Sequence, residues 1–162
     1  MSVIEVQNIT KTLTELCLHP EYFEHAPVIT SEDAAKTRGL ELKQGIKALL
    51  FTNGKKSWVI VDVPANKKAD LKKIATALEW SKRETRMATP EEVLEVTGCE
   101  IGSVPPFGHK QKVIILVDIG VYDNISSAYN IGLRTHSVVI DTHEMRAVFN
   151  YVEAIEGDFA KI

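Results

Sequence analysis

The sequence predicts a single α+β domain, residues 1–162, built around a mixed β-sheet. The length is typical of one domain, and the chain has no internal repeat, low-complexity tract or linker-like change of composition. An apolar content of 44% with 25% charged residues is ordinary for a globular protein with a core. Short β-branched stretches alternate with capped segments whose apolar residues recur at helical spacing, which indicates both strands and helices.

The N-terminal quarter predicts two helices with a short strand between them. Apolar residues at helical spacing over residues 3–18 predict a helix that ends at His19-Pro20. Residues 22–24 predict a short strand. The polar run TSED opens residues 30–38 and supplies N-cap chemistry for a second helix, which Gly39 ends.

The next segment predicts a hairpin and a basic helix. Residues 45–52 and 57–63 flank Asn53-Gly54, a strong signal for two antiparallel strands joined by a turn. Residues 67–78 have apolar side chains on one face and lysines elsewhere, which predicts an amphipathic helix with a basic exposed side.

A strand, a helix and a loop follow. Residues 83–87 predict a short strand. Thr89-Pro90-Glu91-Glu92 begins a helix with a cap, a proline in the first turn and favourable acids, and Gly98 ends it. The stretch GCEIGSVPPFGHK, residues 98–110, then interrupts regular structure with three glycines and two adjacent prolines.

The C-terminal third predicts three strands and a helix. The strands are residues 112–117, 127–131 and 137–140, of which the first is strongly β-branched. Asp141 can cap a final helix that runs to Glu153.

Positive charge is concentrated in one segment of an acidic chain. The net charge is −3, yet residues 36–86 hold 13 Lys and Arg against 5 Asp and Glu, and the remainder holds 6 against 17. Such a concentration can form a basic face suited to a polyanion. It can equally be a pair of solvated helix faces, and the sequence leaves both interpretations open.

The signatures of several large enzyme classes are absent from the sequence. No GxGxxG follows a strand, and neither HExxH nor GxSxG occurs. The 98–110 loop is not a Walker A phosphate loop, because five residues separate Gly102 from Gly108, and Pro105 and Pro106 lack amide hydrogens. No two of the five histidines have i, i+4 spacing, so we expect no metal and no cofactor.

Cysteine usage and hydropathy predict a cytoplasmic protein that does not enter a membrane. Cys17 and Cys99 are too few for a disulfide scaffold and lack CxxC spacing, which suits a reducing compartment. The start does not have the pattern of a secretory signal, and no apolar run approaches the roughly 20 residues of a membrane span. Cys99 is either a nucleophile or a small buried hydrophobe.

Lys47 interrupts an apolar strand. By two-residue alternation it shares a face with Leu49 and Phe51. Either that face is solvated at Lys47, or the ammonium lies at the rim of a pocket where an anionic ligand offsets its desolvation. Both interpretations stay open.

Five motifs occur in order along the chain: EHAPVITSEDAA (24–35), GIKALLF (45–51), DLKKIATAL (70–78), TGCEIGSVPPFG (97–108) and GLRTHSVVID (132–141). In this order they resemble the YbaK and prolyl-tRNA synthetase-associated editing domain family, and the resemblance covers nearly the whole chain. The most specific feature is a lysine in an apolar strand followed by a GxxxP loop with a further glycine.

The resemblance implies a freestanding trans-editing deacylase, which hydrolyses the ester that joins a wrong amino acid to a tRNA, most often a tRNA for proline. It also implies a barrel-like mixed sheet with flanking helices. Lys47 matches the family's lysine, which helps hold the terminal adenosine of the tRNA. Gly102 and Pro106 match the GxxxP loop, with Gly98 and Gly108 as its flanking glycines.

The composition of this loop suits ester hydrolysis. Negative charge develops on the carbonyl oxygen in the transition state, and each fixed backbone amide that meets it is worth roughly 3 to 4 kcal/mol. Glycines let the backbone approach closely, and prolines hold it rigid. We therefore expect an oxyanion-binding and amino-acid-sizing loop with Val104 and Phe107 as pocket walls. A purely structural turn is the alternative.

The candidate site residues fall into three groups. The candidate catalytic residues are Lys47, Gly102, Ser103, Val104 and Pro106. The candidate substrate-binding residues are Phe23, His25, Gly98, Cys99, Phe107, Gly108 and Ser137. The candidate tRNA-binding residues are Lys43, Lys55, Lys56, Lys67, Lys68, Lys72 and Lys73, with Lys47 beside them.

Two departures from the family concern the amino acid removed. Cysteinyl-type members tend to carry Tyr-Glu-His where this chain has Phe23-Glu24-His25, and an acid where it has Ser137. Removal of alanine, serine or threonine is therefore favoured over cysteine. The resemblance implies no protein nucleophile, since water or a substrate group such as the ribose 2′-hydroxyl attacks the ester.

Two other functions stay open: a non-catalytic tRNA- or nucleotide-binding module of the same fold, and a hydrolase of small acyl esters. The expected partners are the aminoacylated 3′ end and acceptor stem of tRNA, together with prolyl-tRNA synthetase. The expected state is a monomer or a weak homodimer.

Overall fold

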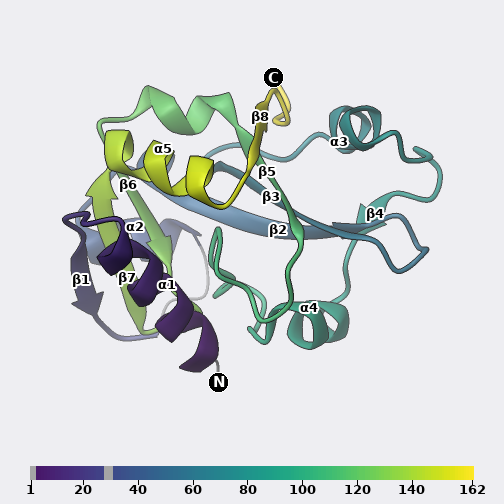
Figure 1. Ribbon diagram of the computed structural model, residues 1–162. Helices are drawn as coiled ribbons and strands as arrows, with labels where there is room; N and C mark the ends of the chain where they lie inside the picture. The colour runs from purple at the N-terminus through teal and green to yellow at the C-terminus, as the bar shows by residue number, and fades with distance from the viewer. Residues whose placement is uncertain (1–2, 28–30) are drawn as a thin grey trace.

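The computed structural model describes residues 3–27 and 31–162, which form two open β-sheets with α-helices around them (Figure 1). The helices are α1 (Val3–Glu15), α2 (Ser31–Arg38), α3 (Leu71–Leu78), α4 (Pro90–Thr97) and α5 (Thr142–Tyr151), with short 3-10 turns η1 (Leu42–Gln44) and η2 (Ile119–Asp123). The strands are β1 (Glu21–Glu24), β2 (Ile46–Thr52), β3 (Trp58–Pro64), β4 (Arg86–Met87), β5 (Ile114–Asp118), β6 (Ser126–Asn130), β7 (His136–Asp141) and β8 (Ile155–Gly157).

The two sheets meet at one end of β2. The larger has the order β4-β2-β3-β5-β8, and the smaller has the order β1-β7-β6. Pairing is antiparallel except for β3 with β5 and β5 with β8, and one parallel bridge, Gly45 to Ala128, joins the sheets. The predicted α+β class with a mixed sheet is confirmed. The expected barrel-like form is corrected in one respect, because both sheets remain open rather than closing on themselves.

Alternation along β3 divides the core into two layers. Ile60 faces the larger layer, in which α1, α4 and α5 pack through residues such as Ile9, Val93 and Phe149. Val59 and its alternate neighbours face the smaller layer beneath α3. Figure 1 shows the smaller sheet gathered at one end of the molecule and the β2–β3 hairpin crossing to the other, where α3 and β4 lie.

The sequence predictions of a capped helix at α4 and of a hairpin formed by β2 and β3 are confirmed. The Thr89 hydroxyl accepts a hydrogen bond from the Glu92 N–H, the Glu92 carboxylate accepts one from the Thr89 N–H, and Gly98 ends the helix at a φ of +77°. Strands β2 and β3 pair antiparallel around Asn53-Gly54, and Gly54 also has a φ of +77°.

Other boundaries differ from the sequence prediction. Helix α3 begins at Leu71, because the Asp70 carboxylate accepts hydrogen bonds from the N–H groups of Lys72 and Lys73 and so caps it. Helix α1 ends at Glu15, and Asp141 precedes α5 without a side-chain cap hydrogen bond. Thr30, the first residue of the expected α2 cap, lies outside the described residues.

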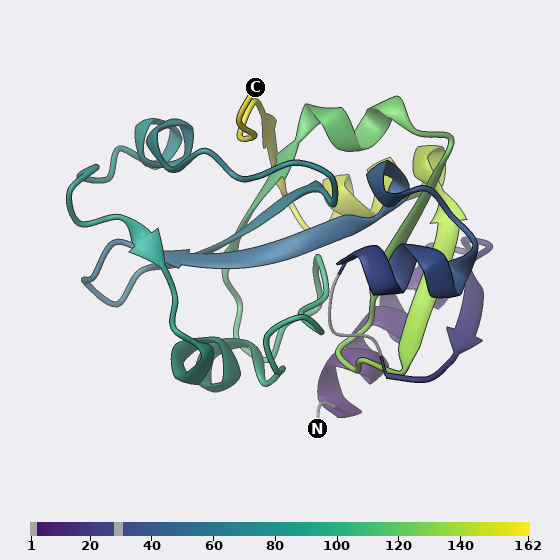
Figure 2. The ribbon, with the colours of Figure 1, turned by 180° about the vertical axis from the view of Figure 1, so that it is seen from behind.

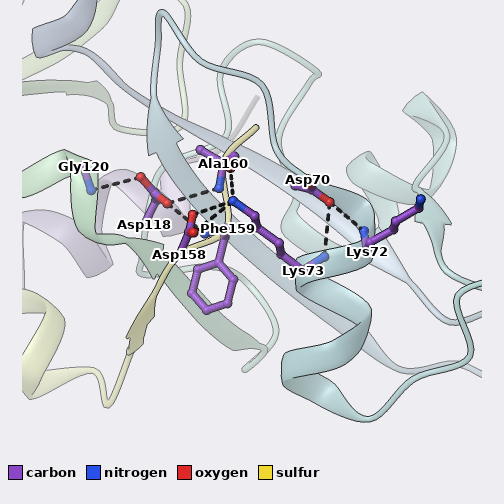
Figure 3. A network of polar contacts seen from close by, with 8 residues as sticks. All are labelled: Asp70, Lys72, Lys73, Asp118, Gly120, Asp158, Phe159 and Ala160. Carbon is purple, nitrogen blue, oxygen red and sulfur yellow. Dashed lines mark hydrogen bonds and ion pairs between the residues drawn. The ribbon is translucent and has the colours of Figure 1, made fainter. Parts of the chain in front are cut away.

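Polar contacts hold the C-terminal tail at the end of β5 (Figure 3). The buried Asp118 carboxylate at the end of β5 accepts hydrogen bonds from the N–H groups of Phe159 and Ala160 at 2.8 and 3.1 Å, and from Gly120 at 3.0 Å. Lys73 of α3 reaches the same tail through Asp158 and the Ala160 carbonyl. Strand β8 and this tail were not predicted. No helix in the described ranges is long and apolar enough to cross a bilayer.

Candidate functional site

A cavity of about 170 Å³ lies beside the exposed edge of β2. Figure 2 shows α2 and the loop after α4 on the same side of this strand. Helix α2 contributes Ala34 and Ala35, β6 contributes Ala128 and Asn130, and residues 46–50 of β2 form the floor. The loop after α4 closes the cavity with Ile101, Gly102 and Val104. Segments distant in sequence therefore converge on one small, mostly apolar space.

The cavity exists because β2 lacks a neighbour over part of its length. On this edge, β4 pairs only with Phe51 and Thr52, and the Ala88 N–H donates to the Leu50 carbonyl at 2.9 Å. The strand next meets a neighbour at the bridge from Gly45 to Ala128. Between these points the backbone edge of β2 faces the cavity.

Lys47 lies on this uncovered stretch of β2. It is half-buried, it is the register partner of Val63 on β3, and it lines the cavity. Of the two interpretations left open by the sequence, its position favours the one at a pocket. Most other lining residues are alanine or aliphatic, and Lys47 and Glu41 are the charged residues among those that the structure describes in the lining.

The loop after α4 is held by side chains that bind its carbonyl groups. Asn130 Nδ2 donates to the Gly102 carbonyl at 2.8 Å, and Asn8 Nδ2 of α1 donates to the Gly108 carbonyl at 3.1 Å. His109 Nε2 lies 2.6 Å from the Pro105 carbonyl. Burial lowers the pKa of His109 to about 4, so at neutral pH the ring is uncharged and Nε2–H is the donor.

Two lining residues of the same loop have N–H groups without a hydrogen-bond partner among the described residues. The Ser103 N–H donates a hydrogen bond to the Glu100 carbonyl at 3.0 Å. The N–H groups of Gly102 and Val104 make no hydrogen bond to any part of the chain that the structure describes. Two lining residues thus carry unused backbone donors, and donors of this kind stabilise a developing oxyanion where they converge on it.

Comparison with known proteins assigns the family. A family model described as the aminoacyl-tRNA editing domain matches residues 25–148. The chain belongs to this family. The match includes the β2 lysine, the loop after α4 and the β6–β7 hairpin, which are the parts that form the cavity.

Two relatives and one solved structure illustrate how this editing domain occurs. The multifunctional Ser/Thr-tRNA deacylase ProXp-y of Escherichia coli K12 is 32% identical over 122 residues, which is 73% of this chain and 72% of that protein. A proline–tRNA ligase of Thermosipho melanesiensis is 36% identical over 98 residues, which is 60% of this chain but 17% of the ligase. A crystal structure assigned provisionally as a trans-editing enzyme for prolyl tRNA synthetase has a TM-score of 0.82 at 25% identity and covers 100% of this chain.

Several residues expected at the site of the editing domain lie behind it. Phe107 is fully buried in the core against Tyr129, with ring centroids 5.9 Å apart, so it does not wall the cavity as expected. Cys99 is also in the core, which favours the small-hydrophobe interpretation. Ser103 and Pro106 are buried within the loop and do not line the cavity. The flanking glycines, Gly98 and Gly108, lie outside the lining as well.

Phe23, His25 and Ser137 form a layer behind Asn130. His25 Nε2 lies 2.8 Å from Ser137 Oγ, and Ser137 Oγ lies 3.5 Å from Asn130 Oδ1. Phe23 is on the edge strand β1, opposite Ser137, and is exposed. None of the three is among the described residues that line the cavity.

The candidate tRNA-binding lysines divide by their contacts. Lys56, Lys67, Lys68 and Lys72 are exposed on the hairpin turn and around the start of α3. Lys73 Nζ forms an ion pair with Asp158 at 2.9 Å, so Lys73 is a poor candidate for binding a tRNA phosphate. Lys43 and Lys55 are paired with Glu41 and Glu84 at 3.5 and 3.3 Å, at exposed positions where such pairs are weak.

Sequence reasoning missed Asn130 and the small residues of the lining. Ala34, Ala35, Ala128 and Ala88 carry no chemical signature, although their size is what leaves space beside β2. Asn130 ends a strand that already contains Ser126 and Ser127, so its polarity does not stand out in the sequence. Among the described residues, no group of three or more His, Cys, Asp and Glu side chains is placed to hold a metal ion.

Proposed function

We propose that this editing domain acts in trans on mischarged tRNA, with tRNA for proline as the substrate, and removes a small amino acid such as alanine, serine or threonine. As a member of its family the chain is an aminoacyl-tRNA deacylase, an ester hydrolase. The observation that supports the proposal is one cavity whose lining includes Lys47, Gly102 and Val104.

The residues have distinct roles in the proposed reaction. The Lys47 ammonium holds the anionic 3′ end of the tRNA at the cavity. The aminoacyl group enters the space between α2 and the loop, and the N–H groups of Gly102 and Val104 meet the carbonyl oxygen as it gains negative charge. Water or the ribose 2′-hydroxyl is the nucleophile.

The lining supports a small side chain. Alanine and glycine make up half of the lining residues outside β2, and Asn130 provides a polar group among them. The ProXp-y relative is named for Ser- and Thr-tRNA, and the ligase relatives carry a matching segment inside proline–tRNA ligase. These names support tRNA for proline and prolyl-tRNA synthetase as partners, and the cytoplasm as the compartment.

The test is ester loss from a panel of tRNAs for proline charged with alanine, serine, threonine, cysteine and proline. We expect rapid loss for at least one small non-cognate amino acid and little loss of proline. Lys47→Ala should lower the rate by about 100-fold, the scale of a lost electrostatic contact to the reacting group. Lys112→Ala, an exposed lysine outside both the cavity and the candidate tRNA-binding set, is the matched control.

Two outcomes would contradict the proposal. If no ester in the panel is lost, the proposed substrate is wrong, and a binding module of the same fold is favoured for this tRNA. If a short acyl ester without tRNA is hydrolysed as fast as the aminoacyl-tRNA, it is a small-ester hydrolase.

A further inference from the structure

Arg134 contacts the segment that leads directly into Gly102. It lies in the turn between β6 and β7, and its Nη2 donates to the Ile101 carbonyl at 2.6 Å. Its Nη1 lies 3.0 Å from a Glu100 carboxylate oxygen. One planar guanidinium thus contacts two consecutive residues at the start of the loop.

The contact with the Ile101 carbonyl determines where the next N–H points. All peptide bonds in the described ranges are trans, and in a trans peptide the C=O and the following N–H point in opposite directions. The Ile101 carbonyl and the Gly102 N–H belong to the same peptide unit. Arg134 is not among the cavity-lining residues, whereas Ile101 and Gly102 are. A carbonyl turned toward Arg134 therefore turns the Gly102 N–H away from it.

The following peptide unit is held from the same hairpin. Asn130, at the end of β6, donates to the Gly102 carbonyl, and the Ser103 N–H donates to the Glu100 carbonyl. The carbonyls of Ile101 and Gly102 both accept hydrogen bonds. Rotation of the peptide unit that joins these two residues would therefore break a hydrogen bond. We propose that Arg134 is a positioning residue that aims the Gly102 N–H at the substrate carbonyl; this rests on the proposed deacylase function.

A surface ion pair is the competing explanation for Arg134. The Glu100 side chain is 63% exposed, and pairs of this kind contribute little to stability. The carbonyl contact is short and charge-assisted, and unlike the ion pair it acts directly on the backbone of the loop. Glu100→Gln removes the ion pair and leaves the carbonyl contact, so it separates the two explanations.

The experiment compares wild type, Arg134→Met, Arg134→Lys and Glu100→Gln in single-turnover deacylation over a range of enzyme concentrations. We expect Arg134→Met to lower the maximal rate constant by about 10- to 100-fold, with little change in the half-saturating concentration. Arg134→Lys should recover part of the rate, because its ammonium can still donate to the carbonyl. Glu100→Gln should stay within about threefold of wild type, and thermal melting verifies that each variant is folded.

The Gly102 amide resonance in a ¹H–¹⁵N spectrum gives a readout that needs no activity. It should shift in Arg134→Met and stay near its wild-type position in Glu100→Gln. An unmoved resonance in Arg134→Met overturns the inference, as does a wild-type rate or an equal loss in Glu100→Gln. If wild type hydrolyses no mischarged tRNA, the proposed function fails, and the catalytic role of Arg134 fails with it. The resonance then decides only whether Arg134 orients the loop.

Discussion

At Gly102 the backbone has a φ of +88°, a region that L side chains rarely enter. Alanine there would strain the loop by about 1 kcal/mol or more and turn the N–H away from the cavity. We predict that Gly102→Ala lowers the deacylation rate at least about tenfold. Gly54→Ala is the matched control, because Gly54 has a φ of +77° in the distant hairpin turn. It should lose similar stability and keep its activity; equal activity loss in both variants would refute a specific role for Gly102.

Asp62 is a buried carboxyl in the middle of β3. Both carboxyl oxygens lack a hydrogen-bond partner among the described residues, and burial raises the pKa well above its ordinary value. In the unfolded chain the Asp62 side chain has an ordinary pKa of about 3.9. Above that pH the side chain ionises only in the unfolded chain, so the free energy of unfolding falls as the pH rises. The fall ends when the pH passes the folded-state pKa.

Asp62→Asn removes this titration and keeps the shape of the side chain. We predict that the variant gains stability relative to wild type as the pH rises from 4 to 7, by up to about 1.4 kcal/mol per unit. Urea unfolding of both proteins across that range measures the difference. Parallel stability curves would show that Asp62 is ionised in the folded protein.

At the scale of elements, the C-terminal tail depends on the end of β5. The three N–H groups that donate to Asp118 would lose their acceptor in Asp118→Ala, and hydrogen bonds to charged groups are worth about 1.5–3 kcal/mol each. We predict a loss of at least about 3 kcal/mol in unfolding free energy. Asp158→Ala breaks only the more exposed pair with Lys73 and should cost less than about 1 kcal/mol. Similar costs for the two variants would contradict the structural role of Asp118.

Elements specified by neighbouring residues were predictable from the sequence. The α4 cap at Thr89 and the hairpin at Asn53-Gly54 depend on contacts within a few residues, and both are confirmed. Strand β8 was not predictable, because its three residues are mostly exposed and its pairing with β5 comes from distant chain. The start of α3 was misplaced, because Asp70 caps the helix after a lysine-rich stretch that also has helical spacing.

At the scale of the whole molecule, only part of the candidate site can be predicted from the sequence. Lys47 and the glycine–proline loop stand out by composition, and the structure places both at one cavity. Whether an apolar loop residue faces a pocket or the core depends on three-dimensional packing, which is why Phe107 was misassigned. Arg134 and Asn130 act on the loop from the β6–β7 hairpin, and no local spacing reveals that contact.

The concentration of positive charge in residues 36–86 predicts how the affinity for tRNA depends on salt. Exposed lysines around the hairpin turn and α3 would release counterions from phosphates on binding, so affinity should fall steeply with salt. Reversing Lys67, Lys68 and Lys72 to glutamate should weaken binding and flatten the plot of log affinity against log salt. Reversing Lys11 and Lys112, outside the basic segment, is the control. An unchanged salt slope in the triple variant would mean that these lysines are only solvated.

The most direct measurement is a crystal structure with a seryl-adenosine analogue whose ester is replaced by a non-hydrolysable 3′-amide. The account predicts the analogue in the cavity beside β2, with its carbonyl oxygen about 2.7–3.1 Å from the N–H groups of Gly102 and Val104 and its adenosine next to Lys47. An analogue bound elsewhere, or one whose carbonyl points away from the loop, would contradict it.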